Sequence, residues 1–250
     1  MNRLALFEDR SALQFTPIAL MRPVFELLCG QYTARERILK SVPVEEWGVL
    51  IRPALTEVYA EEFPEARIND AIWLSEGPTL LINGRWLPAL HEIPCLADLT
   101  AESVGMMGDT VAYLLLEPEE AALLTTDAWD DAIQKIASTR KPVEVAGTEL
   151  HFPWDLVNQN RQQLVDDFAL SASTRPATGN LDNLTVVGPS DLVQVDESAE
   201  IDPFVVLDTR QGPIVIDRDA RIQAFTRIEG PAYIGPGTQL FRANVKAGTT

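Results

Sequence analysis

Apolar and polar stretches alternate along about the first 150 residues of the chain. Four short apolar runs have the length of buried strands: Leu4–Phe7, Gly48–Ile51, Thr79–Ile82 and Val111–Leu116. The last of them is almost entirely apolar, as in a strand that is covered on both faces. The charged residues Glu8, Asp9 and Arg10 end the first run and predict a loop there.

Helix signals follow these runs. Thr33 and Glu36 have the spacing of a capping box and predict a helix through about Lys40. Prolines that suit a first helical turn, and one good N-cap, predict further helices at Pro53, Pro118, Asp127 and Pro153. Alternating strands and helices predict an α/β domain with a mainly parallel sheet and crossover helices.

The last of these helices is predicted to end the first domain. Val157, Leu164 and Phe168 have helical spacing, so a connecting helix is expected over about 154–170. The polar run Ser171–Asn180 contains a proline and a glycine and predicts a boundary. We therefore expect an α/β domain over residues 1–170 and a second domain over 181–250.

A six-residue period follows residue 195. The first position of each hexad is aliphatic and the fifth is small: Ile216 and Ala220, Ile222 and Thr226, Ile228 and Ala232, Ile234 and Thr238, Leu240 and Asn244. Earlier hexads begin at Val195 and Ile201, and a loop around 208–213 interrupts the register. This spacing predicts a triangular solenoid whose aliphatic residues fill the interior and whose small residues fit the corners. The alternative, a meander of short strands, would not hold the spacing over five hexads.

Two expectations concern the ends and partners of this solenoid. Hexapeptide solenoids are left-handed parallel β-helices that commonly pack around a threefold axis, so we expect a homotrimer by analogy. The sequence stops part-way through a hexad, at Thr250. Either another chain covers this end or the natural protein continues past Thr250, and we favour the second.

The composition excludes several classes of function. Acidic residues outnumber basic ones by 37 to 20, for a net charge of -17, so a nucleic acid polymer is not an expected partner. Two cysteines are too few for a disulfide framework, and no apolar stretch has the roughly 20 residues of a membrane span. The first ten residues are too charged for a secretory signal. A soluble cytoplasmic protein without a membrane partner is expected.

Three short motifs carry a resemblance to a known family. They are the run from Arg22-Pro23 to Glu36, the Asn83-Gly84-Arg85 sequence after a strand, and Pro153-Trp154-Asp155-Leu156 before the connecting helix. With the hexads, this order resembles the bifunctional N-acetylglucosamine-1-phosphate uridylyltransferase/glucosamine-1-phosphate acetyltransferase family, and more closely an alternate branch of it. The resemblance implies a sugar nucleotidyltransferase-like domain and an acyltransferase-type β-helix.

The implied reaction joins a nucleoside triphosphate to a sugar 1-phosphate and releases pyrophosphate, as in UDP-N-acetylglucosamine biosynthesis. Such chemistry needs backbone N–H groups, basic residues at the phosphates and carboxylate-held Mg²⁺. The family's glycine-rich loop is missing after the first strand here. On the resemblance, Arg10 and Arg22 take the places of the family's basic residues. The alternative is two solvated surface arginines.

The family's metal-binding aspartate is also missing, since Arg85 stands near its place and an arginine cannot ligate a cation. Arg85 either neutralises a phosphate or marks a lost activity. Asn83 and Gly84 are expected to bind substrate, with an ordinary turn as the alternative. Mg²⁺ is implied by the resemblance, with no metal ligand identified. If Arg10, Arg22 and Arg85 form one site, their guanidinium groups should converge on one cleft.

Acetyl transfer is not expected from this chain. The related acetyltransferases use a histidine on a later coil as the general base, whereas His91 and His151 both precede the repeat. His91 and Cys95 have no established zinc spacing and are expected to be structural. Two functions remain open: a sugar-1-phosphate nucleotidyltransferase, or a nucleotide-sugar-binding or scaffolding protein that has lost catalysis.

Overall fold

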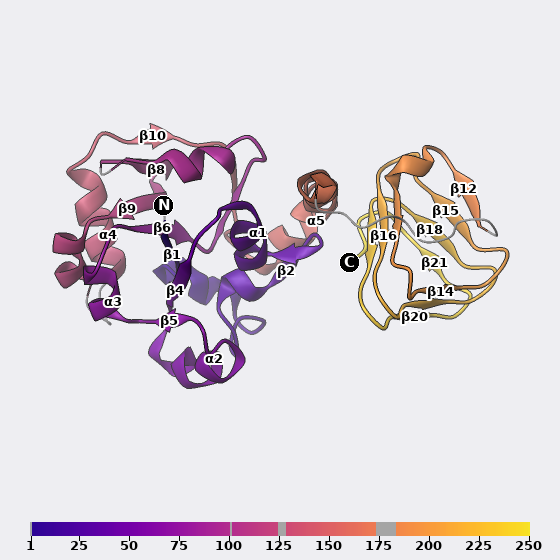
Figure 1. Ribbon diagram of the computed structural model, residues 1–250, viewed down its shortest axis with the longest axis horizontal. Coiled ribbons are helices and arrows are strands. Elements are labelled where there is room, and N and C mark those ends of the chain that lie inside the picture. Colours follow the sequence, from indigo (N-terminus) through magenta and orange to yellow (C-terminus); the bar gives the residue numbers. More distant parts are fainter. Residues whose placement is uncertain (1, 101, 125–128, 174–183) are drawn as a thin grey trace. The chain divides into compact units, whose positions relative to one another are not determined.

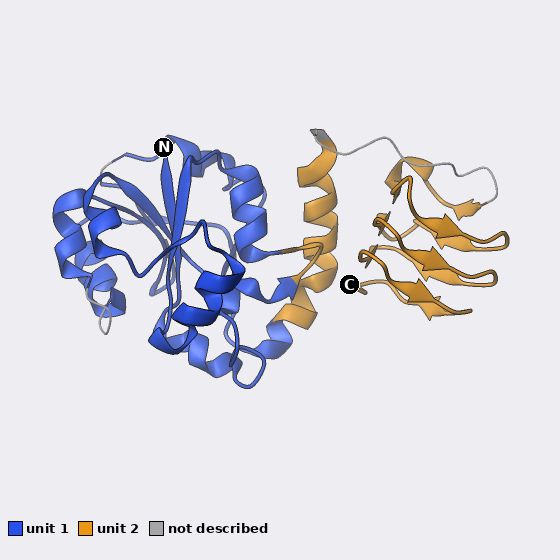
Figure 2. Cartoon of the chain, turned by 60° about the horizontal axis from the view of Figure 1, so that its bottom comes forward, with its two compact units in different colours: residues 1–28, 33–155 blue, residues 29–32, 156–250 orange. Residues whose placement is uncertain are grey.

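The computed structural model describes residues 2–100, 102–124, 129–173 and 184–250. The chain forms two compact units, coloured separately in Figure 2. Unit 1 comprises residues 1–28 and 33–155, and unit 2 comprises residues 29–32 and 156–250. Much of the predicted boundary at 171–180 lies outside the described residues. Within the described part, no helix is long and apolar enough to span a membrane.

Unit 1 is built on a seven-stranded sheet in the order β10-β8-β9-β6-β1-β4-β5 (Figure 1). Its strands are β1 (Arg3–Phe7), β4 (Glu46–Leu50), β5 (Arg67–Ile68), β6 (Thr79–Asn83), β8 (Val104–Met107), β9 (Thr110–Leu116) and β10 (Val143–Glu144). Strand β1 runs parallel to β4 and β6, β4 is parallel to β5, and β8 is parallel to β10. The prediction of a mixed α/β fold with a mainly parallel sheet is confirmed.

Strand β9 departs from that pattern. It is buried from Val111 to Leu116, as its apolar sequence predicts, but it runs antiparallel to both β6 and β8. The turn at Gly108, where φ is +58°, joins β8 directly to β9 and forces this reversal.

Both faces of the sheet are covered. Ala5 and Phe7 of β1 contribute to a core that includes Trp73 of α3 and Ile133 of α4. The alternate residue Leu6 points to the other face and is also buried. The α-helices of the described residues are α1 (Ala34–Ser41), α2 (Thr56–Glu62), α3 (Ala71–Ser75), α4 (Trp129–Ser138) and α5 (Pro153–Leu170).

The helix starts follow the sequence signals closely. The hydroxyl of Thr33 accepts the N–H of Glu36 at 3.2 Å, and the Glu36 carboxylate accepts the N–H of Thr33 at 3.0 Å, so the capping box is confirmed. Pro53 begins a short 3-10 helix that leads into α2. The helix expected at Pro118 is also 3-10, over Pro118–Leu123, rather than an α-helix. The predicted cap Asp127 lies outside the described residues.

Two small strand pairs and several 3-10 turns complete the first part of the chain. The pairs are the antiparallel β7 (Trp86–Pro88) and β11 (Gly147–Glu149), and β2 (Leu28–Cys29) with β3 (Tyr32–Thr33). The turn between β2 and β3 belongs to unit 2 because α5 holds it: the N–H groups of Gly30 and Gln31 donate to the side chains of Asn160 and Asp167.

Unit 2 contains three small parallel sheets, and the chain passes through them in strict rotation. The first sheet holds β12 (Thr185–Val187), β15 (Val206–Asp208), β18 (Arg227–Glu229) and β21 (Asn244–Val245). The second holds β13 (Val193–Val195), β16 (Ile214–Ile216) and β19 (Ala232–Ile234), and the third holds β14 (Glu200–Ile201), β17 (Arg221–Ile222) and β20 (Gln239–Leu240). Figure 2 shows the parallel strands stacked in this unit.

The first residues of four successive hexads have the burial expected of them, but the hexad that begins at Leu240 departs from the prediction, because Asn244 is exposed and Ile228 pairs with Val245, seventeen residues later. Ile216, Ile222, Ile228 and Ile234 are all buried in one cluster, and the small residue Ala220 is buried beside them. The interrupting loop also has a defined effect on the register. Ile216 pairs with Ile234, eighteen residues later, whereas Val195 pairs with Ile216, twenty-one residues later. The loop therefore adds three residues without breaking a pairing.

Candidate functional site

The carboxyl ends of β1 and β6 form the edge where a ligand site is expected. The chain passes from β1 to β4 and β5 on one side, and then returns to β6 on the other side of β1. In open parallel sheets, ligands bind at the carboxyl ends of strands where the strand order reverses in this way. Glu8, Asp9 and Arg10 follow β1 at this edge, and Gly84 and Arg85 follow β6.

Arg85 is buried at this edge and is fully engaged by protein acceptors. Its Nε and Nη2 donate to the two carboxylate oxygens of Asp9, at 2.7 and 2.5 Å. Nη2 also lies 2.8 Å from Oε1 of Glu149, and Nη1 donates to the carbonyl of Leu150 at 2.6 Å. Burial lowers the pKa of Arg85, but the hydrogen bonds and charges of Asp9 and Glu149 more than reverse this. The guanidinium therefore holds the two carboxylates in place.

Asn83 and Gly84 shape the same corner. The side-chain amide of Asn83 donates to Oδ2 of Asp9 at 2.9 Å and to the carbonyl of Val111 at 3.1 Å, while its carbonyl accepts the N–H of Arg85. A Cβ at Gly84 would lie 2.5 Å from Cδ1 of Phe25, so only glycine fits there. These contacts give both residues a structural role at the site's edge, whether or not they touch a substrate.

Glu8 is the second buried carboxylate of the edge. Its carboxylate accepts the N–H of Val24 at 3.0 Å and the Nε of Arg52 at 3.0 Å. Burial raises the pKa of Glu8, and Arg52 offsets only part of that rise. The carbonyl of Glu8 accepts the indole N–H of Trp129 at 2.8 Å, which ties the end of β1 to the start of α4.

Arg10 is the exposed cation of this edge. It begins a 3-10 helix over Arg10–Phe15 that Asp9 caps, and its side chain is 67% exposed. Its guanidinium pairs with Asp131 at 2.5 Å and lies 4.0 Å from Asp130. Arg22 is exposed and joins the edge through its backbone, because its carbonyl accepts Nη2 of Arg52.

The three arginines therefore differ in their surroundings. Asp9 caps the 3-10 helix that begins at Arg10 and also pairs with Arg85, so both arginines lie at one edge. The guanidinium of Arg10, however, binds Asp131, whereas that of Arg85 binds Asp9. The observed contacts give no convergence of all three groups on one cleft.

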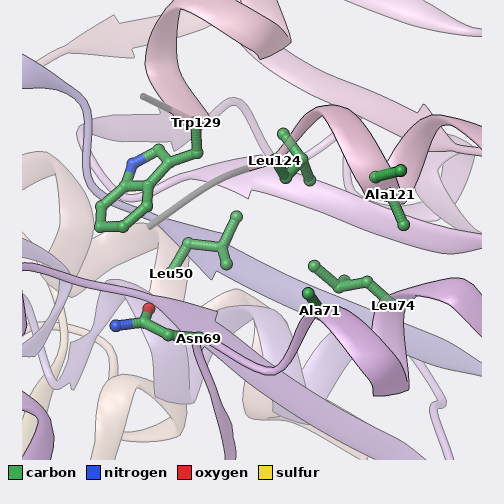
Figure 3. A pocket seen from close by; sticks show the side chains of 8 residues that line it. Leu50, Asn69, Ala71, Leu74, Ala121, Leu124 and Trp129 are labelled. Atoms are coloured by element: carbon green, nitrogen blue, oxygen red, sulfur yellow. The ribbon is translucent and has the colours of Figure 1, made fainter. Parts of the chain in front are cut away.

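A pocket of about 270 Å³ opens beside this edge (Figure 3). Leu50 and Asn69, at the carboxyl ends of β4 and β5, form one side, and Trp129 forms another. The remaining lining comes from Ala71, Leu74, Ala121, Ala122 and Leu124. Asn69 is held at a φ of 51° because its amide group bonds both the N–H and the carbonyl of Ile51 at 2.9 Å. The pocket is therefore mainly apolar and has the size of one ring system.

The residues of the edge do not fit a resident magnesium ion. Both oxygens of Asp9 are taken up by Arg85, with Asn83 and Ser11 as further donors. Among the described residues, no group of three or more His, Cys, Asp or Glu side chains is placed to hold a metal. His91 and Cys95 also make a local contact, since the thiol donates to the His91 carbonyl at 3.6 Å.

Sequence reasoning missed the residues that organise the edge. The sequence predicts only a loop at Glu8 and Asp9, and no spacing connects this loop to Glu149 or Trp129. The adjacent acidic pair directly after a buried strand was the available signal. The pocket had no such signal, because its lining comes from four separate stretches of sequence.

Similar proteins were found among protein families and among solved structures. The family model for sugar nucleotidyl transferases matches residues 4–176. The structure of a proposed glucose-1-phosphate thymidylyltransferase from Bacillus anthracis, in complex with a sucrose, is similar at 12% identity. The match covers 66% of this chain and 95% of that one, with a TM-score of 0.46. No curated protein sequence matches the chain.

The fold and its carboxyl-edge site define a nucleotidyltransferase-like α/β protein. Because the family model spans well over half of the chain, the chain belongs to the sugar nucleotidyl transferase family. The matched residues end before the first strand of the three small parallel sheets.

Proposed function

We propose that unit 1 is a sugar-1-phosphate nucleotidyltransferase. An oxygen of the sugar 1-phosphate attacks the α-phosphorus of a nucleoside triphosphate, and the bond to the β-phosphate oxygen breaks to release pyrophosphate. The observation that supports this most directly is an apolar, ring-sized pocket beside an exposed arginine at the carboxyl edge of the sheet. Family membership supports the same reaction class.

The pocket suits the nucleobase. Its volume of about 270 Å³ is too small for a whole nucleoside triphosphate, and the Trp129 indole on its wall offers a flat apolar surface. The phosphates would then extend toward Arg10, whose partners Asp130 and Asp131 lie in the first turn of α4. A surface pair of this kind costs little to exchange for a phosphate contact.

Arg85 has a positioning role in this proposal. It offsets one of the two negative charges of Asp9 and Glu149 and so reduces the repulsion that these carboxylates would exert on an anionic substrate. Arg10, Arg22 and Arg85 as catalytic residues, and Asn83 and Gly84 as substrate-binding residues, remain predictions. Mg²⁺ is expected only as the counter-ion of the triphosphate, because the edge does not supply a resident site for it.

The deciding experiment is a pyrophosphate-release assay with Mg²⁺, several nucleoside triphosphates and several sugar 1-phosphates. We expect turnover with at least one pair, and a loss of at least tenfold in kcat/KM for Arg10→Ala. Arg221→Ala, an equally exposed arginine of unit 2, is the matched control and should keep full activity. Unchanged turnover in Arg10→Ala would show that Arg10 is not part of the site.

A catalytically inactive nucleotide-sugar-binding or scaffolding protein is the second candidate. The buried pairing of Arg85 with Asp9 favours it, because that pairing occupies the carboxylate nearest the expected metal position. Binding of a nucleotide-sugar without pyrophosphate release from any substrate pair would establish this candidate in place of the first.

For unit 2, we propose a left-handed parallel β-helix of the acyltransferase type that assembles as a homotrimer. The rotation of the chain through three sheets and the buried hexad positions support the solenoid. Light scattering at several concentrations tests the trimer, and a monomer would exclude it. Acetyl transfer by this chain is still not expected, and the cytoplasmic location stays a prediction.

A further inference from the structure

An exposed pair of aromatic rings lies just outside the carboxyl edge. The rings of Phe152 and Trp154 stack with centroids 4.7 Å apart and an angle of 20° between their planes. Phe152 is 40% exposed and Trp154 is 59% exposed, so the pair contributes little to the core. Two large aromatic rings held together in solvent need another explanation.

The backbone around the pair is held firmly in place. The carboxylate of Asp155 accepts the N–H groups of His151 and Phe152, at 2.8 and 2.9 Å, and the N–H of Asp155 donates to the Phe152 carbonyl at 2.9 Å. Pro153 fixes its own φ at the first position of α5. The aromatic surface is thus formed before any ligand arrives, which lowers the entropic cost of binding.

Polar groups connect the aromatic pair to the candidate site. His151 Nε2 lies 3.6 Å from Oε2 of Glu149, and the centroid of its ring lies 6.5 Å from that of Phe152. The other oxygen of Glu149 pairs with Arg85 at 2.8 Å and accepts the hydroxyl of Thr110 at 2.8 Å. A flat apolar surface therefore borders a carboxylate and an imidazole, all within unit 1.

We propose that the stacked pair of Phe152 and Trp154 is a platform for the sugar ring of the hexose 1-phosphate substrate, with the outer face of the more exposed Trp154 ring against the sugar. A pyranose has one face of C–H groups that fits an aromatic surface, and a rim of hydroxyls that needs acceptors and donors such as Glu149 and His151. The inference rests on the proposed function and specifies its sugar subsite.

The direct test is ligand-observed NMR with glucose 1-phosphate, mannose 1-phosphate and N-acetylglucosamine 1-phosphate. Saturation transferred from the protein's aromatic protons should reach the C–H protons on one face of the ring. Trp154→Ala should raise the Kd of the sugar 1-phosphate about tenfold, which is the loss of affinity typical of one stacking contact. Trp154→Phe should retain most of the affinity, and the affinity for the triphosphate should stay unchanged in both variants.

Phe241→Ala is the matched control, since Phe241 is an equally exposed aromatic residue of unit 2. It should leave sugar binding unchanged. Far-UV circular dichroism checks that Trp154→Ala is folded. If it is not, Phe152→Leu, which keeps an apolar side chain but removes the ring, replaces it and should also weaken sugar binding.

The outcomes separate this inference from the proposed function. Unchanged sugar affinity in Trp154→Ala, with pyrophosphate release still present, overturns the platform alone. Loss of triphosphate affinity instead of sugar affinity assigns the platform to the base and also overturns the inference. Absence of both binding and turnover in the wild-type protein rejects the proposed function together with the platform.

Discussion

The two units use the same pair of side chains in opposite ways. In unit 1, Arg85 and Asp9 are both largely buried and fix the end of β1 to the end of β6. In unit 2, the side chain of Asp208 is largely covered, but its partner Arg210 is largely exposed and its partner Arg227 is partly exposed. The Arg85–Asp9 pair is thus buried between the ends of two strands, whereas the arginines that bind Asp208 lie at the surface of the stacked strands.

The pKa shifts follow this difference. Burial raises the pKa of Glu8, although Arg52 is bonded to it. Hydrogen bonds from Arg210 lower the pKa of Asp208 to about 2. An arginine partner therefore does not by itself lower the pKa of a carboxyl group: the balance between desolvation and hydrogen bonding decides the direction.

Removing the guanidinium of Arg85 should have the largest effect. Arg85→Ala leaves the buried Asp9 and the partly buried Glu149 without a counter-charge and should lower the free energy of unfolding by about 3–5 kcal/mol. Urea unfolding followed by tryptophan fluorescence reports unit 1 specifically. All five tryptophans belong to it: Trp47, Trp73, Trp86, Trp129 and Trp154.

Arg210→Ala is the corresponding change in unit 2. Its guanidinium is solvent-exposed, so little change in stability is expected. If both variants lost similar stability, the contrast between the two units would be wrong.

Unit 2 should instead depend on its repeated aliphatic residues. Ile228 is fully buried between paired strands, and Ile228→Ala should cost about 3 kcal/mol through lost burial and a residual cavity. Hydrogen exchange measured by mass spectrometry should show faster exchange in β15, β18 and β21. The exposed Phe241→Ala serves as the control, and equal exchange in the two variants would contradict the hexad assignment.

The capping box at the start of α1 is expected to stabilise unit 1 locally. Thr33→Ala removes the acceptor of the Glu36 N–H and should lower stability by about 1 kcal/mol. The unfolding midpoint in urea measures this loss. Thr56→Ala, whose hydroxyl only donates to the Pro53 carbonyl, should change the midpoint much less. The same midpoint for both variants would mean that the box adds no stability.

The smallest effects should appear in acid titrations. The pKa of Asp208 is lowered in the folded state, so its stabilising contribution is present above pH 3.8 and is lost as the pH falls toward about 2. The pKa of Glu8 is raised, so its contribution is present below pH 4.5 and is lost as the pH rises through the folded pKa.

The NMR chemical shifts of the carboxyl carbons should therefore show that Glu8 titrates at a higher pH than Asp208. Asp208→Asn should remove the lower transition and supplies the assignment. Glu8 titrating below its ordinary value would contradict burial as the dominant cause.

Local patterns account for the features that could be predicted. The capping box needs only Thr33 and Glu36, three residues apart, and the hexads repeat one short rule, so both were visible in the sequence. The direction of β9 could not be predicted, because an apolar run is the same in a parallel and in an antiparallel strand. The role of Arg85 depends on Asp9, 76 residues away in sequence, and on Glu149. Such a long-range pairing has no period or spacing to reveal it.

The three extra residues in the loop before β16 show how freely unit 2 tolerates length changes. The pairings of Val195, Ile201 and Leu207 with the next turn of the chain all span the same twenty-one residues, so the extra length is absorbed at a single corner. Where Ile216 and Ile222 pair onward, the spacing is already eighteen again. A corner of this kind can accept an inserted peptide, such as an epitope or a fluorophore tag, while every strand on either side keeps its neighbour.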